Sequence, residues 1–216
     1  MRAKVCLVGP QGVGKTSIAT RIDGTLVSSQ SNVAGTIFAN CDVLVGEQSV
    51  NLQISDISGE EKLRCMGPIY YKGAKAALCV FDLTSEKTLL ALQPWVKSVR
   101  NNASDECILI IMGNKSDMEN RQVSQIHAHK YAESMGAKYF EVSAHTGQGL
   151  LKVMIYLAKY LMRWNDCFNT YAAKRSITSS CLEHKAPQGK RTRSRSFSFP
   201  LRKLSVTNNS IESKRT

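Results

Sequence analysis

The chain has 216 residues, of which 43% are hydrophobic, and it carries a formal net charge of +12 at pH 7. This length favours one domain with an additional segment over two full domains. Seven scattered cysteines without a CxxC pair suggest a reducing compartment and argue against a disulfide framework and a cysteine-based zinc site.

The first third of the chain alternates between strand and helix patterns. Residues 3–8 form a short apolar run, and residues 14–22 have a helical start. Two segments with alternating side chains, 41–45 and 49–55, flank a Gly-Glu pair. This arrangement predicts a β-hairpin.

Two nearly continuous apolar runs follow, at residues 76–82 and 107–113. Such runs are typical of central parallel strands that are buried on both faces. Between them, residues 86–101 look helical, but Pro94 lacks a backbone N–H. We therefore expect this helix either to kink or to restart at the proline.

The last predicted elements are a helix from Ser124 to Met135, a strand over 138–143 and an amphipathic helix over 149–164. Strands that alternate with helices in this way predict an α/β fold, a sheet with helices on both faces. Ligands of such sheets bind at the carboxyl ends of the strands.

The composition changes near residue 165. Residues 165–216 hold 11 Lys/Arg and 3 Asp/Glu, so this segment alone carries +8, whereas the preceding 164 residues carry +4. The segment is rich in Ser and Arg and poor in core-forming residues. We predict a folded domain over 1–164 and a basic, Ser-rich, disordered tail over 165–216.

Residues 9–16 read GPQGVGKT and match the pattern G-x-x-x-x-G-K-[ST] between a strand and a helix. In this pattern backbone N–H groups wrap the phosphates of a nucleotide, which requires glycine where a Cβ would obstruct them. The lysine reaches the β- and γ-phosphates, and the hydroxyl that follows it ligates Mg²⁺. The predicted phosphate-binding residues are Gly12, Val13, Gly14, Lys15, Thr16 and Ser17.

Two later stretches, GNKSD at 113–117 and EVSA at 141–144, each end a strand-like run. The carboxylate of Asp117 can accept from both N1–H and the exocyclic amine of guanine, a donor pair that adenine lacks. The stem of Lys115 can cover the purine face. Asn114 can tie this loop to the phosphate loop, and the N–H of Ala144 can donate to the guanine oxygen. The predicted base-binding residues are Asn114, Lys115, Asp117, Ser143 and Ala144, and the predicted ligands are GTP and GDP.

With these motifs in order, the chain resembles the Ras superfamily of small GTPases over residues 3–164, and within it the Rab family. LQISDISGEE, YYKGA and CVFDLT look specifically like Rab segments. The resemblance implies the P-loop small-GTPase fold, a mostly parallel six-stranded sheet with five helices. It also implies Mg²⁺-dependent hydrolysis of GTP to GDP, a role in membrane traffic, and exchange factors and effectors of the Rab type.

The resemblance also assigns roles in the two switch segments. Asp56 matches the acidic residue that holds Mg²⁺ through water, and Gly59 matches the glycine that contacts the γ-phosphate. Glu60 stands where the family has the Gln that orients the attacking water. An ionised Glu accepts but does not donate, so we expect slow turnover. Gln11 can either obstruct an incoming arginine finger or contact the phosphate itself.

The first switch departs further from the family. The position of its Mg²⁺-ligating Thr falls on Val33 or Ala34, and Thr36 substitutes only if the loop shifts. Val27 replaces an aromatic side chain over the guanine. These changes leave a second hypothesis open, a guanine-nucleotide-binding scaffold that recruits partners without cycling.

For the tail, the resemblance and the composition predict partners. The chain ends in ESKRT without a terminal Cys, so we expect no prenylation. KRTRSRSFSFPLRK interleaves basic and aromatic residues and favours an anionic membrane surface, whereas nothing resembles a folded nucleic-acid reader. RSFSFP resembles a 14-3-3 motif that requires phosphorylation of Ser198. We expect a monomer that is cytoplasmic or peripheral on endomembranes, since no apolar stretch approaches the length of a membrane span.

Overall fold

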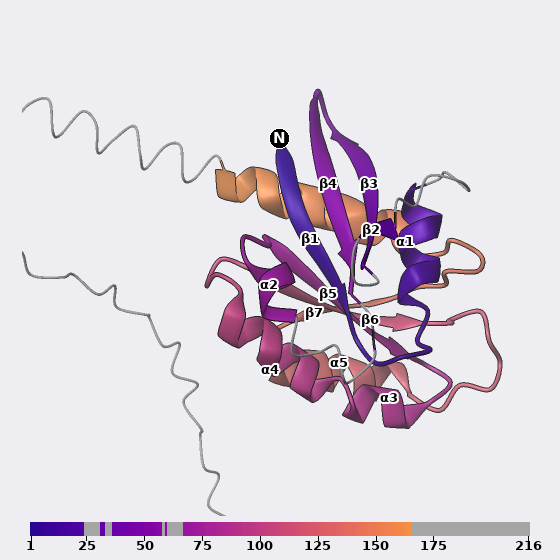
Figure 1. Cartoon of the computed structure of the whole chain (residues 1–216). Coiled ribbons are helices and arrows are strands. Elements are labelled where there is room, and N and C mark those ends of the chain that lie inside the picture. Colours follow the sequence, from indigo (N-terminus) through magenta and orange to yellow (C-terminus); the bar gives the residue numbers. More distant parts are fainter. Residues whose placement is uncertain (24–30, 33–35, 58, 60–66, 166–216) are drawn as a thin grey trace, which may run out of the picture. The chain divides into compact units, whose positions relative to one another are not determined.

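The computed structural model describes residues 1–23, 31–32, 36–57, 59 and 67–165 (Figure 1). All of them belong to the unit Met1–Ala173, one of two units into which the chain divides. Apart from residue 165, the predicted tail lies outside the described residues, and its boundary stays a prediction.

One mixed sheet with the strand order β2-β3-β4-β1-β5-β6-β7 forms the centre of this unit (Figure 1). Strands β1, β4, β5, β6 and β7 run parallel to one another, whereas β3 pairs antiparallel with β4 and with β2. The prediction of a mostly parallel α/β sheet is confirmed. Two-residue β2 adds an edge strand to the six expected, because so short a segment has no periodicity to reveal it. The strands are β1 Arg2–Val8, β2 Ser31–Asn32, β3 Thr36–Val45, β4 Gln48–Asp56, β5 Ala76–Asp82, β6 Ile108–Asn114 and β7 Lys138–Glu141.

The helices differ from the predicted segments in two ways: one predicted helix is broken, and the short helix α2 (Gly67–Tyr71) was not predicted from the sequence. The segment predicted as one helix over 86–101 is two, α3 and α4, and α4 restarts with Pro94 in its first turn. A proline costs little there, since the first N–H groups of a helix have no partner within the helix. The labelled helices are α1 Lys15–Asp23, α2 Gly67–Tyr71, α3 Glu86–Leu90, α4 Gln93–Asn102 and α5 Gln125–Ser134. A further helix occupies residues 150–165 (orange in Figure 1).

The sheet separates two apolar cores, and β5 contributes to both. Leu78 and Val80 pack with α1 and with the helix over 150–165, whereas Cys79 and Phe81 pack with α2, α4 and α5. Every residue of β5 is buried. The continuous apolar run at 76–82 is therefore explained by burial on both faces of a central strand.

The described cysteines are free and serve as packing groups. Burial raises the pKa of Cys6 to about 12 and that of Cys107 to about 11. It also raises the pKa of Cys79, which is completely buried. These thiols stay protonated at neutral pH and behave as small hydrophobes.

The parallel strands bring their carboxyl ends to one edge of the sheet. Leu7 pairs with Asp56 across β1 and β4, and Asp82 pairs with Asn114 across β5 and β6. Polar residues thus follow buried strands at adjacent positions, which places the predicted motifs beside one another. Among the described residues, no helix is both long and apolar enough to cross a bilayer.

The two-sided burial of β5 predicts a large difference between two leucines that both lie in strands. Leu78→Ala should lower the free energy of unfolding by about 2–5 kcal/mol, because the side chain is completely buried and leaves a cavity. Leu44→Ala, at a side chain that is 71% exposed, should change it by less than about 0.5 kcal/mol. Denaturant titration measures both, and equal effects would contradict this description of the core.

Candidate functional site

The loop between β1 and α1 depends on glycine at three positions. Gly9, Gly12 and Gly14 have φ angles of 143°, 79° and 93°, which L side chains rarely adopt. A Cβ on Gly9 would also collide with the carbonyl oxygen of Val80, and one on Gly14 would collide with the amide of Asn114. The loop therefore passes close to two neighbouring strands, with its N–H groups at the start of α1, an arrangement that suits phosphate.

Lys15 begins α1 and is buried, with its side chain folded back over the loop. Its Nζ donates to the carbonyl oxygen of Pro10 at 2.8 Å. Burial lowers the pKa of Lys15, and the neighbouring Asp56 partly opposes this shift. Among the described residues no carboxylate forms an ion pair with this ammonium, and a phosphate would supply the counter-charge.

Gly59 lies directly against this loop. A Cβ at Gly59 would stand 2.7 Å from both the backbone N of Gln11 and the carbonyl carbon of Pro10. The structure therefore brings together two of the three residues that the sequence analysis assigned to the surroundings of the γ-phosphate, Gln11 and Gly59. The third, Glu60, lies outside the described residues.

Thr16 and Asp56 form the predicted metal pair. The Thr16 hydroxyl donates to Asp56 Oδ2 at 2.6 Å, and the buried Asp56 Oδ1 has no hydrogen-bond partner among the residues that the structure describes. Burial raises the pKa of Asp56 above its ordinary value, although Thr16 and Lys15 both oppose the shift. A hydroxyl beside a buried carboxylate oxygen that lacks a partner fits Mg²⁺, which binds few protein ligands and keeps waters and phosphates. Within the described residues, no group of three or more His, Cys, Asp or Glu offers an alternative metal site.

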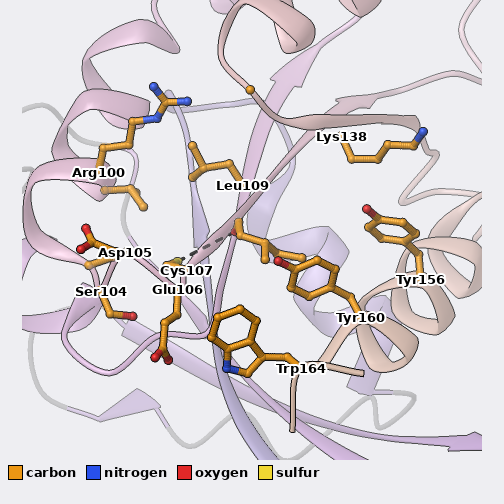
Figure 2. A pocket seen from close by; sticks show the side chains of 14 residues that line it. Arg100, Ser104, Asp105, Glu106, Cys107, Leu109, Lys138, Tyr156, Tyr160 and Trp164 are labelled. Carbon is orange, nitrogen blue, oxygen red and sulfur yellow. Dashed lines mark hydrogen bonds between the residues drawn. The ribbon is translucent and has the colours of Figure 1, made fainter. Parts of the chain in front are cut away.

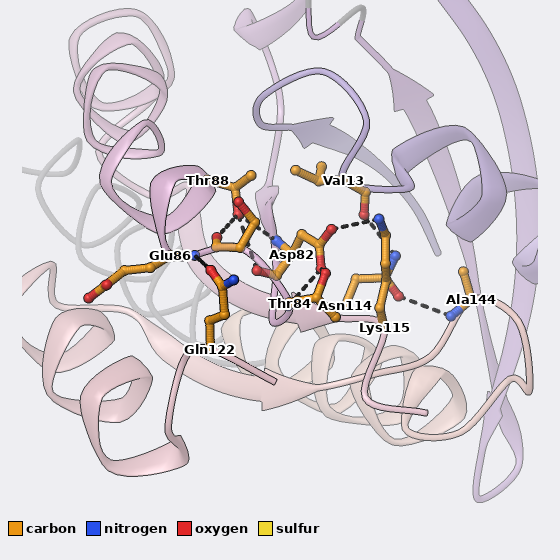
Figure 3. A network of polar contacts seen from close by, with 10 residues as sticks. Val13, Asp82, Thr84, Glu86, Thr88, Asn114, Lys115, Gln122 and Ala144 are labelled. Carbon is orange, nitrogen blue, oxygen red and sulfur yellow. Dashed lines mark hydrogen bonds and ion pairs between the residues drawn. The ribbon is translucent and has the colours of Figure 1, made fainter. Parts of the chain in front are cut away.

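The buried amide of Asn114 joins three loops (Figure 3). Its Nδ2 donates to the carbonyl oxygen of Val13 at 2.8 Å, and its Oδ1 accepts from the backbone N–H of Ala144 at 3.0 Å. The predicted tie to the phosphate loop is thus present. The N–H of Ala144, predicted to donate to the guanine oxygen, donates to Asn114 in this structure.

A cavity of about 560 Å³ opens beside these loops. Asp117 stands at its rim, and the buried hydroxyl of Ser143 is the main reason that the pKa of Asp117 lies below its ordinary value. Asp117 is therefore ionised at neutral pH and can accept two hydrogen bonds. The cavity is lined by Gly14, Ser17, Asn114, Lys115, Asp117, Met118, Ala144 and His145.

The sequence analysis missed two residues that line this cavity and a third that forms an ion pair with a residue of its wall. Met118 and His145 belong to its wall but have no distinctive spacing. Asp82, the last residue of β5, makes an ion pair of 2.6 Å with Lys115 (Figure 3). The available signal was an acidic residue at the end of a continuous apolar run, where strands of such a sheet present their ligands.

Several predictions about the first switch fall outside the described residues, namely those for Val27, Val33 and Ala34. The backbone of Thr36 begins β3, where it pairs with Asn32. Its side chain is not among those described, so its proposed substitution for the missing hydroxyl stays a prediction.

A second cavity, of about 640 Å³, lies elsewhere, at the amino end of β6 (Figure 2). Tyr156, Tyr160 and Trp164 line it from the helix over 150–165, and the loop over 104–107 lines it opposite. None of the predicted site residues reaches it. Those predicted residues that the structure describes instead gather at the carboxyl ends of the strands.

Comparisons with known proteins found similar sequences over most of this chain. A family model described as the Ras family matches residues 4–163, which include the whole predicted site. Ras-related protein Rab5 of Nicotiana tabacum is 31% identical over 191 residues, covering 88% of this chain and 92% of the relative. Ras-related protein Rab-21 of Homo sapiens is 35% identical over 161 residues, covering 74% and 72%. Ras-related protein RabJ of Dictyostelium discoideum is 31% identical over 181 residues, covering 82% and 71%.

The unpartnered oxygen of Asp56 predicts opposite effects on stability and on metal binding. A carboxyl whose pKa is raised by folding costs stability once it is ionised, so this cost is present at neutral pH and disappears as the pH falls through that pKa. Asp56→Asn should therefore raise the melting temperature of the protein in a chelator at pH 7. It should also weaken Mg²⁺ binding by at least about tenfold. A thermal melt and a Mg²⁺ titration test these effects.

Asp42→Asn is the matched control, because Asp42 also lies in the hairpin and is hydrogen-bonded to Asn51. It should leave Mg²⁺ binding unchanged. A lower melting temperature for Asp56→Asn in the chelator would contradict the assignment of Asp56 as a metal ligand whose charge destabilises the metal-free protein.

Proposed function

Because the chain belongs to the Ras family of small GTPases, we propose that the loops at the carboxyl ends of its strands form one pocket for guanine nucleotide and its Mg²⁺. The chain is a Rab-like small GTPase, a GTP hydrolase of membrane traffic that binds GTP, GDP and Mg²⁺. Exchange factors and effectors are its general partners. In the proposed pocket, one group of residues binds the base and another binds the phosphates and the metal.

The observation that carries the proposal is the pair of hydrogen bonds made by Asn114. One bond reaches the phosphate loop and the other reaches the loop at Ala144. A single buried amide therefore fixes the spacing between the loop proposed to bind the phosphates and the loops proposed to bind the base. In this proposal Asp117 selects guanine, and the stem of Lys115 covers one face of the base.

The residues at the phosphate end have separate tasks. Lys15 and the loop N–H groups offset the negative charge of the phosphates, and Thr16 and Asp56 hold the metal. Mg²⁺, when bound, withdraws charge from the phosphate oxygens. Gly59 lets a backbone N–H approach the loop where any side chain would collide with Gln11.

We propose slow hydrolysis because Glu60 replaces the family's Gln, whose side-chain amide can both accept and donate hydrogen bonds. A carboxylate can accept from the attacking water but cannot stabilise the developing negative charge with an N–H. Because neither Val33 nor Ala34 has a hydroxyl, the first switch can make fewer contacts with GTP that it would not also make with GDP. The scaffold hypothesis is not favoured, since the chain belongs to a family of GTP hydrolases.

Two finer partner assignments come from the tail sequence. Its 11 basic residues support attraction to an anionic membrane surface, worth about 1 kcal/mol for each basic residue close to the lipid. Phosphorylation of Ser198 would add a dianionic group recognised by a basic cluster in a 14-3-3 protein, and it would weaken the attraction to lipid.

Single-turnover hydrolysis of GTP tests the proposed activity. The wild-type chain should bind GTP and release phosphate slowly, with a requirement for Mg²⁺. Glu60→Gln should increase the rate constant by about tenfold, because the amide can orient water and also donate to the transition state. Glu47→Gln, in the exposed hairpin turn, is the matched control and should leave the rate unchanged.

Two outcomes would oppose this proposal in different ways. A wild-type chain that retains neither GTP nor GDP would remove the assigned pocket. A chain that retains both equally and releases no phosphate after hours, with or without Glu60→Gln, would restore the scaffold hypothesis.

The 14-3-3 assignment is tested with peptides that span residues 190–204. The peptide phosphorylated at Ser198 should retain 14-3-3 protein in a pull-down, whereas the unphosphorylated peptide should not. Equal retention by the two peptides, or none by either, removes this partner.

A further inference from the structure

Asp82 lies outside the motifs that predicted the site, yet its carboxylate is fully engaged (Figure 3). Its Oδ1 accepts from the backbone N–H and the hydroxyl of Thr84, at 2.8 and 2.7 Å. Its Oδ2 lies 2.6 Å from Lys115 Nζ. The side chain of Asp82 is only 9% exposed, whereas that of Lys115 is 36% exposed. The carboxylate of Asp82 is therefore fixed in position, and it holds the more exposed side chain of Lys115.

The backbone of Asp82 and of the next residue is also held by hydrogen bonds. The hydroxyl of Thr88 accepts from the N–H of Asp82 at 2.9 Å and lies 2.7 Å from the carbonyl oxygen of Ser85, to which it donates. The next residue, Leu83, donates its N–H to the carbonyl oxygen of Asn114 at 3.0 Å. The end of β5 is thereby fastened both to the start of α3 and to the end of β6.

Lys115 needs such a partner because of its backbone. Its φ of 65° is positive, and no other non-glycine among the described residues has a positive φ. This conformation is unfavourable for a residue with a Cβ and persists where surrounding contacts enforce it. Lys115 directly follows Asn114 and lines the 560 Å³ cavity. Its conformation therefore sets the shape of one wall of that cavity.

Lys115 also has a second acidic neighbour. Asp117 lies on the same loop, and the charge of Lys115 contributes to the lowered pKa of Asp117. Asp82 has its own pKa held down: burial opposes ionisation, but the hydrogen bonds from Lys115 and Thr84 outweigh it. Two ionised carboxylates thus compete for one ammonium, and in this structure Asp82 holds it.

We propose that Asp82 is a positioning residue for guanine recognition: by holding the Lys115 ammonium, it keeps the lysine stem in place as a wall of the base pocket and leaves the Asp117 carboxylate free for the base. This inference deepens the proposed function and rests on it. Without Asp82, the ammonium turns toward Asp117 and occupies acceptor positions that the purine requires.

The test is the dissociation rate of a fluorescent GDP analogue from the full chain, chased with excess GDP in Mg²⁺. Asp82→Asn preserves the shape and an acceptor for Thr84 but removes the charge that holds Lys115. It should increase the dissociation rate by about tenfold. The preference for GDP over inosine diphosphate, which lacks the exocyclic amine, should also shrink, because Asp117 is then partly occupied.

The matched control is Glu106→Gln. Glu106 makes an ion pair of the same length, 2.6 Å, with Lys75, and it lies at the amino end of β6, away from the base pocket. Its loss should change the GDP dissociation rate by less than about twofold. A general effect of removing a salt bridge is thereby separated from an effect on the pocket.

A double-mutant cycle with Lys115→Met distinguishes positioning from a merely structural role. If Asp82 acts through Lys115, then Asp82→Asn should add less than about twofold when Lys115 is already Met. Thr84→Val, which keeps the backbone hydrogen bond to Asp82, supplies a milder second probe should Asp82→Asn fail to fold. It should raise the rate by about threefold, and this increase should also vanish in the Lys115→Met background.

A dissociation rate for Asp82→Asn within about twofold of the wild type, or effects that multiply in the double mutant, would overturn the inference. In either case a wild-type chain that binds GDP leaves the proposed function standing. Failure of the wild type to bind GDP at all would remove the proposed function, and this inference with it.

Discussion

The buried side chain of Asn114 is the contact on which the site depends. It is 1% exposed, and it joins the end of β6 to the phosphate loop and to the loop after β7 through two hydrogen bonds. Burying an amide is favourable only when both its donor and its acceptor are satisfied. The loops therefore hold their relative positions because neither can move without leaving a buried polar group unpaired. These two hydrogen bonds fix the loops that line the proposed pocket.

Two buried carboxylates at the same edge of the sheet have opposite roles. Asp82 has partners for both oxygens and a pKa below its ordinary value, so it is part of the framework. Asp56 has a pKa raised by burial and an oxygen with no hydrogen-bond partner in the described part of the chain, so a cation would improve its environment. Lys15 is the cationic counterpart of Asp56: its ammonium is buried, and burial lowers its pKa. In the proposed pocket, bound metal and phosphate would offset the cost of burying these two charges.

The strands and helices could be predicted where the local signal was strong. The apolar run at 76–82 indicated a central strand, and Pro94 indicated the break between α3 and α4. The sequence alone offered no physical reason for the glycine that opens GNKSD, whereas the structure shows why a side chain does not fit at this position. A Cβ on Gly113 would stand 2.8 Å from a methyl carbon of Leu83 and 2.9 Å from the hydroxyl of Tyr139. The pairing of Asp82 with Lys115 was not predictable, because it depends on the register of β5 against β6 and on the positive φ of Lys115.

The loops at the carboxyl ends of the strands are proposed to form one pocket that recognises guanine and its phosphates together. Calorimetric titration of the full chain with GDP and with ADP, both in Mg²⁺, tests this claim most directly. We expect tight binding of GDP and an affinity for ADP weaker by about 10⁴-fold, since adenine would leave the Asp117 carboxylate unpaired. Equal affinities for the two nucleotides, or no heat of binding with either, would contradict it.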